Sequence, residues 1–237
     1  MGFHDPIKTL ESPIEVMYLM HKVFMSHSDH TLELVSKVET GECSIADVKR
    51  SFDLWIKHLL YHVQTEDIYM TGPLKEKKLQ DGRMVLKENV SEHNDLREMG
   101  ADLFAKIGKD ARESLIEDVL ALDDQNHEEL LDQLRIADSA IIETLGEQTI
   151  LRRSIRHIYR SIFDFIVVEF DHFENEEAFV LTLVREQMTY EQQLQLTEKL
   201  LFDSTDQNEN WIVDFLFSVL DDDESRLLEE LISEIKG

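Results

Sequence analysis

Apolar residues recur at intervals of three and four along most of this chain, with polar residues at the positions between them. Residues three, four and seven apart share one face of an α-helix, so the pattern predicts amphipathic helices. Glycine (8 residues) and proline (3) are scarce, which disfavours folds built from many turns. We therefore expect an all-α fold whose helices cover residues 12–40, 44–70, 84–107, 111–145, 148–184, 189–202, 211–220 and 224–235.

Capping sequences and helix breakers mark the expected boundaries. A serine or threonine followed three residues later by an acid or amide is typical of a helix beginning. Three such pairs are Ser12 with Glu15, Ser44 with Asp47, and Thr189 with Gln192. We expect Gly41 and Gly146 to end helices, and Gly72 with Pro73 to break the second helix. The polar run 203–210 is expected to be a linker.

Histidine is the most informative residue type, because four of the ten histidines fall on the apolar stripes of four expected helices. An acid follows two of them by one helical turn. The resulting set is His21, His62, Glu66, His93, His172 and Glu176. Burying so many polar groups is costly unless something satisfies them. Imidazole and carboxylate suit iron and related ions, and helical bundles build such sites from inward side chains.

An internal repeat supports this interpretation more strongly than the individual residues do. A single core histidine is usually just hydrogen-bonded, and acids four residues after a histidine are expected by chance in so acidic a chain. Aligning His62 with His172, however, also matches Trp55 with Phe165, Glu66 with Glu176, Asp67 with Glu177 and Tyr69 with Phe179. The shared pattern predicts a duplicated helix that bears half of a site.

Charge and cysteine content narrow the possible partners. The formal net charge of −26 disfavours nucleic acid and anionic membrane surfaces, which bind through lysine and arginine. Cys43 is the only cysteine, so neither an intramolecular disulfide nor a thiolate metal site is expected. The chain begins without a long apolar segment and has no apolar run of membrane-spanning length, which favours a cytoplasmic protein.

Taken in order, these motifs resemble the hemerythrin-like (HHE cation-binding) family. The matching segments are YLMHKVF at His21, YHVQTED at His62, SEHNDLRE at His93 and DHFENEE at His172. The resemblance covers about residues 12–185. It implies a four-helix up-down bundle of hemerythrin type with two iron ions, oxo- or hydroxo-bridged. Glu66 and Glu176 would bridge the ions, and the histidines would cap them. The implied small ligand is dioxygen or nitric oxide, in a sensing or redox role.

Several features depart from the family pattern. Arg97 stands where oxygen carriers have a second histidine on the third helix, which puts reversible oxygen carriage in doubt. Glu177 competes with Glu176 for the last carboxylate position. The 79 positions from His93 to His172 exceed a compact connection, so we expect an inserted helical hairpin over 109–145, with a possible break near Asp123 and Asp124. The expected domains are thus 1–185, the metal-binding bundle, and 186–237, a C-terminal helical extension.

Alternatives for ligands and function stay open. His127 lies on an apolar stripe of its own and is an alternative third-helix ligand, while His58 lies one turn before His62. Glu169 and His172 fit the Glu-x-x-His pattern of ferritin-like di-iron oxidases or peroxidases, although no second copy occurs. The alternative of a different class is a metal-free helical interaction protein. The apolar faces of 211–220 and 224–235 would then bind a partner or form a homodimer, rather than pack on the bundle.

Overall fold

The computed structural model describes residues 6–76, 109–147 and 149–237, with the backbone alone for 109–115. In these ranges all regular structure is helical and no strand occurs, which confirms the all-α prediction. The expected helix 84–107, which carries His93, lies outside the described residues.

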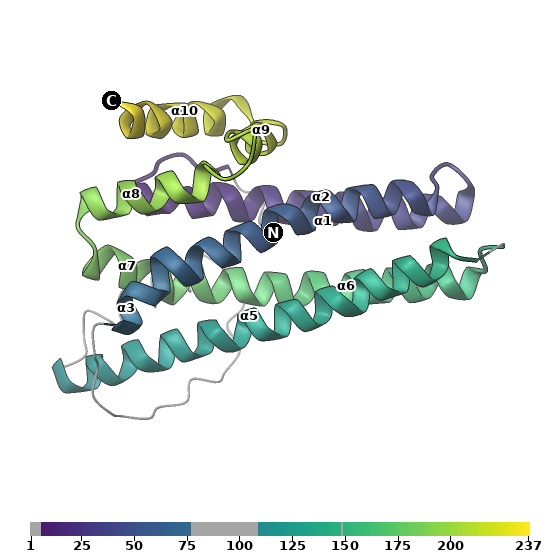
Figure 1. The fold of residues 1–237 in the computed structure, drawn as a ribbon, viewed down its shortest axis with the longest axis horizontal. Coiled ribbons are helices and arrows are strands. Elements are labelled where there is room, and N and C mark those ends of the chain that lie inside the picture. The colour runs from purple at the N-terminus through teal and green to yellow at the C-terminus, as the bar shows by residue number, and fades with distance from the viewer. Residues whose placement is uncertain (1–5, 77–108, 148) are drawn as a thin grey trace.

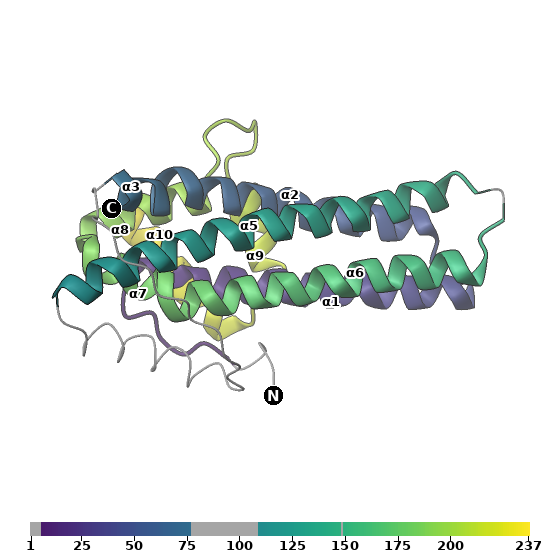
Figure 2. The same cartoon turned by 90° about the horizontal axis from the view of Figure 1, so that it is seen from below.

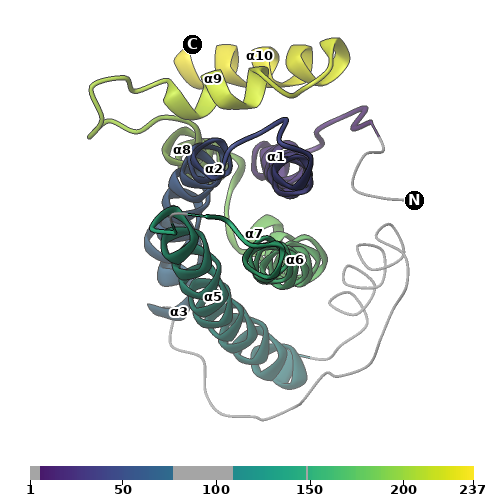
Figure 3. The same ribbon diagram turned by 90° about the vertical axis from the view of Figure 1, so that its right-hand side faces the viewer.

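The longest described helices form a bundle. They are α1 (Val16–Thr40), α2 (Ile45–Thr65), α5 (Lys109–Leu145) and α6 (Arg152–Asn175). Each packs on two of the others, in the ring α1–α2–α5–α6–α1. Figure 1 shows them side by side along the molecule, and the end-on view of Figure 3 shows the ring. Figure 2 shows that the α1–α2 and α5–α6 connections lie at the same end of the bundle.

The α1–α2 connection follows the sequence prediction closely. Gly41 ends α1 with a φ of 76°, a left-handed conformation that glycine adopts without a Cβ clash. Ser44 and Asp47 then form a reciprocal capping box at the beginning of α2. Thr189 and Gln192 form the same motif at the beginning of α8 (Tyr190–Leu201).

The prediction of a capping box at Ser12 is wrong. The Ser12 side chain makes no capping hydrogen bond, and the chain enters α1 through a 3₁₀ turn, Pro13–Glu15. The Glu15 carboxylate is engaged elsewhere, because its Oε1 lies 2.7 Å from Nη1 of Arg185. The other oxygen, Oε2, accepts a hydrogen bond of 2.5 Å from the backbone N–H of Glu11 and not from that of Ser12.

The expected hairpin over 109–145 is instead one continuous helix, α5, which packs against α2 and α6. No glycine or proline occurs between residues 109 and 145, so nothing in the backbone forces a turn. Asp123 and Asp124, the expected break, lie within the helix. Asp123 is buried, and Asp124 pairs with Lys75 at 2.5 Å.

Two wide π turns, Glu66–Thr71 and Glu176–Val180, interrupt the second and fourth members of the ring at equivalent positions. Each turn begins at the glutamate of a His-x-x-x-Glu motif. Helix then resumes as α3 (Gly72–Glu76) and α7 (Leu181–Gln187), so the predicted break at Gly72 and Pro73 is wrong. Pro73 is accommodated because it lies at the beginning of a new helical segment, where its missing N–H costs least.

The π turns also shift the buried face by one residue. The sequence pattern places Tyr69 and Phe179 on the core stripes, but Tyr69 is 46% exposed and Phe179 is only partly buried. Met70 and Val180, each one residue later, are buried instead. A π turn contains about one residue more than an α-helical turn, which explains the displacement.

The C-terminal extension packs on the bundle through α8, α9 (Trp211–Phe217) and α10 (Asp222–Lys236). The polar run 203–210 is non-helical, as predicted. Leu216 and Leu228, on the apolar faces of α9 and α10, are fully buried. Both apolar faces therefore pack at least in part against the rest of the same chain.

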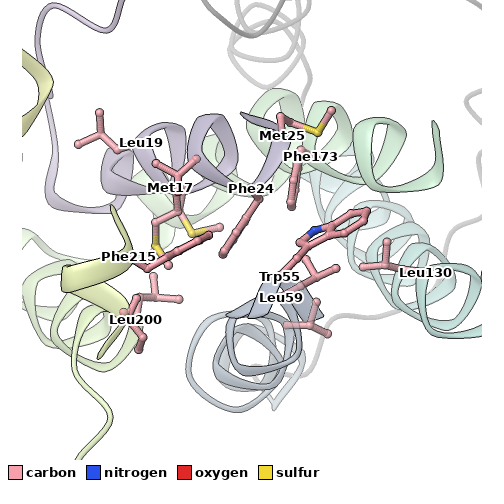
Figure 4. Close-up of a cluster of buried hydrophobic side chains, with 14 of the residues drawn as sticks. Met17, Leu19, Phe24, Met25, Trp55, Leu59, Leu130, Phe173, Leu200 and Phe215 are labelled. Atoms are coloured by element: carbon pink, nitrogen blue, oxygen red, sulfur yellow. The ribbon is translucent and has the colours of Figure 1, made fainter. Parts of the chain in front are cut away.

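Aromatic and aliphatic side chains from both the bundle and the extension share one core. Figure 4 shows Phe24 and Met17 of α1, Trp55 of α2 and Phe173 of α6 with Phe215 of α9. None of the helices in the described ranges is both long and apolar enough to cross a membrane.

Gly72→Ala should destabilise the protein. A Cβ at residue 72 would lie 2.6 Å from the carbonyl oxygen of Asp67, across the π turn. We expect a loss of about 1–3 kcal/mol in the free energy of unfolding, measured by urea denaturation. Gly146→Ala is the control, because its Cβ would meet the nearest atom at an ordinary 3.5 Å. Equal stability of the two variants would show that the π turn relaxes without strain.

Candidate metal centre

Five of the six predicted ligands meet in the middle of the bundle. His21 comes from α1, His62 from α2 and His172 from α6, while Glu66 and Glu176 begin the two π turns. All five side chains are fully buried. The sixth, His93, lies outside the described residues, and His127 of α5 lies beside the other five.

These side chains form two overlapping groups that could hold metal ions. One group contains His21 and His62, the other contains His127 and His172, and both contain Glu66 and Glu176. Within each group the donor atoms lie within 4.8 Å of one another. Two adjacent cation positions that share a pair of carboxylates would use every member.

The shared carboxylates are placed between the two groups. Oε1 of Glu66 lies 2.8 Å from Nε2 of His62, and Oε2 lies 3.6 Å from Nε2 of His127. Glu176 uses one oxygen toward both groups. Its Oε2 lies 3.3 Å from Nε2 of His21 and 3.5 Å from Nε2 of His172. Each glutamate thus contacts one histidine from each half of the bundle.

The second acid of each acid doublet binds a histidine on the neighbouring helix. Asp67 Oδ1 lies 3.0 Å from Nδ1 of His127, and Glu177 Oε1 lies 2.9 Å from Nδ1 of His21. An acceptor at Nδ1 holds the proton there and leaves the Nε2 lone pair directed at the centre. Glu176 belongs to both groups, whereas Glu177 belongs to neither and lies behind His21.

These contacts relate the two halves of the bundle by an approximate twofold. His21 corresponds to His127, and His62 corresponds to His172. The repeat detected between residues 55–69 and 165–179 is one part of this relationship. The correspondence of α1 with α5 is the other part of the twofold relationship. No local motif around His21 and His127 indicates this second part.

Burial and mutual charge shift the pKa values in opposing directions. Burial, reinforced by Glu66, raises the pKa of Glu176 well above its ordinary value. Burial acts on Glu66 in the same sense, but His62 and His127 outweigh it and hold the pKa of Glu66 low. Burial lowers the pKa of His172 well below its ordinary value, with His127 adding to the effect. Without a cation, only part of the set can be charged at neutral pH.

His127 behaves differently from His172. Burial alone would lower its pKa, but the carboxylates of Asp67 and Glu66, 3.0 and 3.6 Å from its ring nitrogens, outweigh burial and raise the pKa to about 10. A metal ion bound at Nε2 of His127 would have to displace a proton, so metal binding should release protons and strengthen as pH rises.

Many polar atoms at the centre have no hydrogen bond within the described part of the chain. They are both carboxylate oxygens of Glu66, Glu176 and Asp123, Nδ1 of His62, Nε2 of His127, and both ring nitrogens of His172. Unsatisfied buried groups each cost on the order of 1–3 kcal/mol, and carboxylates more. Cations at the two positions would satisfy most of them, so the donor set fits metal ions.

Asp123 is a buried acid beside the centre that belongs to neither group and that the sequence pattern does not single out. It is 2% exposed and lies one turn before His127, with Oδ1 3.9 Å from Nε2 of that histidine. Burial raises the pKa of Asp123 to about 7. The available signal was its spacing of four residues from His127, but the expected hairpin placed it in a turn.

The two other alternative site residues, His58 and Glu169, make their hydrogen bonds to groups outside the centre. Nδ1 of His58 donates to the Leu54 carbonyl at 2.7 Å, and its ring stacks on Phe215 with centroids 3.8 Å apart. Glu169 Oε1 accepts a hydrogen bond of 2.6 Å from Nε1 of Trp55. Neither residue belongs to the two metal-binding groups.

Apolar rings enclose the centre. Phe173 stacks on His21 with centroids 4.0 Å apart, and Phe24 lies edge-on to His62 at 5.1 Å. Phe24 in turn stacks on Phe215 of the C-terminal extension at 6.3 Å. His21 and His62 are therefore packed on this side against the same aromatic core that contacts the extension.

No protein-family model, curated protein or solved structure matches this chain, and the functional assignment rests on the donor atoms themselves.

Proposed function

We propose that this chain is a hemerythrin-like, non-haem di-iron protein whose centre senses or reacts with a small ligand such as dioxygen or nitric oxide. The observation that carries the proposal is the pair of buried His/Glu groups that share Glu66 and Glu176. Two-metal sites separate their ions by about 3.5–4 Å, a distance that bridging carboxylates span.

The donor types support the choice of iron. Each position offers two imidazoles and two shared carboxylates, with no thiolate. This mixture suits ferrous and ferric iron, which accept nitrogen and oxygen donors together. Four protein donors would complete a tetrahedral zinc site, whereas about two coordination positions would remain open on a six-coordinate ion.

The open positions favour a small-ligand role over purely structural metal binding. The surrounding rings of Phe24 and Phe173 are apolar, so a small uncharged ligand is better suited to this interior than an ionic substrate. A ferritin-like oxidase is the less favoured alternative, because the carboxylate of its Glu-x-x-His motif, Glu169, is hydrogen-bonded to Trp55.

Metal analysis of the purified protein tests the central claim. We expect two iron ions per chain and near-ultraviolet absorption of a bridged ferric pair that is lost on reduction. Glu66→Gln and Glu176→Gln should each reduce metal content to below about one ion per chain, because losing a shared charge leaves two cations facing each other. Glu143→Gln, at an exposed position of α5, should keep full occupancy. Undiminished metal in both site variants would contradict the shared-carboxylate geometry.

The carboxylates behind the histidines should control affinity rather than stoichiometry. Asp67→Asn and Glu177→Gln replace the charged acceptors that orient His127 and His21 by neutral amides, whose oxygens accept weaker hydrogen bonds. We expect metal to bind about 10–100-fold more weakly in each variant, as is typical of such partners. Competition with a chromophoric chelator measures the change against Glu143→Gln. Affinities equal to those of the control would mean that neither carboxylate orients a ligand.

Metal removal should weaken the fold without abolishing it. Metal binds the folded chain and scarcely the unfolded one, so it stabilises the protein by mass action. The extensive apolar core should keep the stripped chain helical at room temperature. Circular dichroism of untreated and chelator-treated protein, melted side by side, should show a clearly lower melting temperature after treatment. Identical melts after confirmed metal loss would favour the metal-free interaction protein.

A further inference from the structure

The outward side of α6 carries a row of apolar side chains. The inward side of this helix packs on α1 and α5. Tyr159, Phe163 and Val167, spaced by four residues, form the row, which we call the α6 stripe, and they are 41%, 48% and 43% exposed. Exposed apolar residues that stand singly are common, but three large ones in contact on one helix face form a patch that is typical of an interaction surface.

The charged residues of α6 are segregated along the helix. Residues 152–160 contain four arginines and no acid, whereas residues 161–175 contain four acids and neither lysine nor arginine. Arg152 and Arg153 lie in the first turn, where the positive end of the helix dipole disfavours cations. The first half of α6 is thus strongly positive, in a chain whose net charge is −26, and the second half is negative.

Four of these charges line one flank of the α6 stripe. At 100° per residue, they lie about 60–100° to the same side of its central residue. They are Arg153, Arg160, Asp164 and Asp171, and all four are exposed. None of these side chains forms an ion pair or hydrogen bond in the described ranges. The only charged neighbour that acts on Asp171 there is the like-charged Glu129 of α5.

The positions of these charges are self-complementary. Arg153 and Asp171 each lie nine residues from position 162, and Arg160 and Asp164 each lie two residues from it. A second α6 that runs antiparallel across a twofold axis at this position has its charged flank on the same side, in the reverse direction. Each arginine then lies level with an aspartate of the other copy. At the shallow crossing angle of about 20° that antiparallel helix pairs favour, the pairs stay within reach of arginine side chains.

We propose that the α6 stripe and its charged flank form a homodimer interface with a second, antiparallel copy of this chain. Arg153 of each copy pairs with Asp171 of the other, and Arg160 pairs with Asp164. The contact uses the same surface on both copies, so it closes into a dimer and does not propagate into a filament. Repulsion between two acidic chains is screened beyond about 8 Å at physiological ionic strength, whereas these contacts act at short range.

The interface and the metal centre are separate parts of the molecule. His172 projects inward from α6 and is fully buried, on the side opposite the α6 stripe. The inference therefore stands or falls independently of the proposed metal site.

Sedimentation equilibrium of the full chain over a range of micromolar concentrations tests the inference. One helix per copy makes a small contact, so we expect a reversible monomer–dimer equilibrium in the micromolar range. Phe163→Glu brings two carboxylates together at the axis and should weaken association at least about tenfold. Leu54→Glu is the control, because Leu54 is similarly exposed (44%) on α2, diagonally opposite α6 in the ring, and this variant should dimerise like the wild type.

Charge-reversed chains test the register of the two helices. One variant carries Arg153→Glu with Arg160→Glu and has an acidic flank. The other carries Asp164→Arg with Asp171→Arg and has a basic flank. Each alone should stay monomeric where the wild type dimerises, because every pair then joins like charges. Mixed in equal amounts, the two should form a heterodimer of about wild-type affinity, because all four pairs again join opposite charges.

Far-ultraviolet circular dichroism confirms that each variant folds, and recovery on mixing is a result that a purely structural role of these charges would not give. A wild-type chain that stays monomeric throughout overturns the inference. A dimer that Phe163→Glu leaves unchanged, or that Leu54→Glu abolishes, overturns it as well. Folded charge-reversed chains that still self-associate, or that fail to associate on mixing, overturn the proposed pairing.

Discussion

The surrounding structure depends on two carboxylates that face each other in the middle of an apolar bundle. Glu66 and Glu176 are fully buried, and the charge of Glu66 adds to the burial that raises the pKa of Glu176. Such a pair is stable only if cations, protons or hydrogen-bond donors compensate it. The four histidines that surround it, two from each half of the bundle, are the groups that permit cations to do so.

The backbone and the outer carboxylates adapt to this requirement. Each π turn begins at a shared glutamate, and the next residue, Asp67 or Glu177, binds the histidine of the adjacent helix. In each pair of consecutive acids, the first side chain points toward the centre and the second binds a histidine from behind. Four helices are held in register by pairs of polar contacts that the apolar core alone would not specify.

The parts of this arrangement that follow local rules could be predicted from the sequence. The stripes of α1, α2 and α6 place His21, His62 and His172 inward, and the caps at Ser44 and Thr189 mark helix beginnings. The parts that depend on tertiary contacts could not. Helical periodicity assumes a constant turn, so it misplaced Tyr69, which follows the π turn. The long separation of His93 and His172 predicts an insertion where α5 in fact belongs to the ring, so the sequence offers His127 only as an alternative and does not single out Asp123.

The aromatic contacts between centre and extension have a thermodynamic consequence. Phe215 of α9 stacks on Phe24, Phe24 contacts His62 and Phe173, and Phe173 stacks on His21. Close-packed rings cannot shift independently, so the energy of seating α9 depends on the positions of the histidines. Linkage is reciprocal: to whatever extent occupancy of the centre favours docking of the C-terminal helices, their docking favours occupancy equally. If the centre binds ions, their release and the release of the extension would therefore be coupled by one free energy.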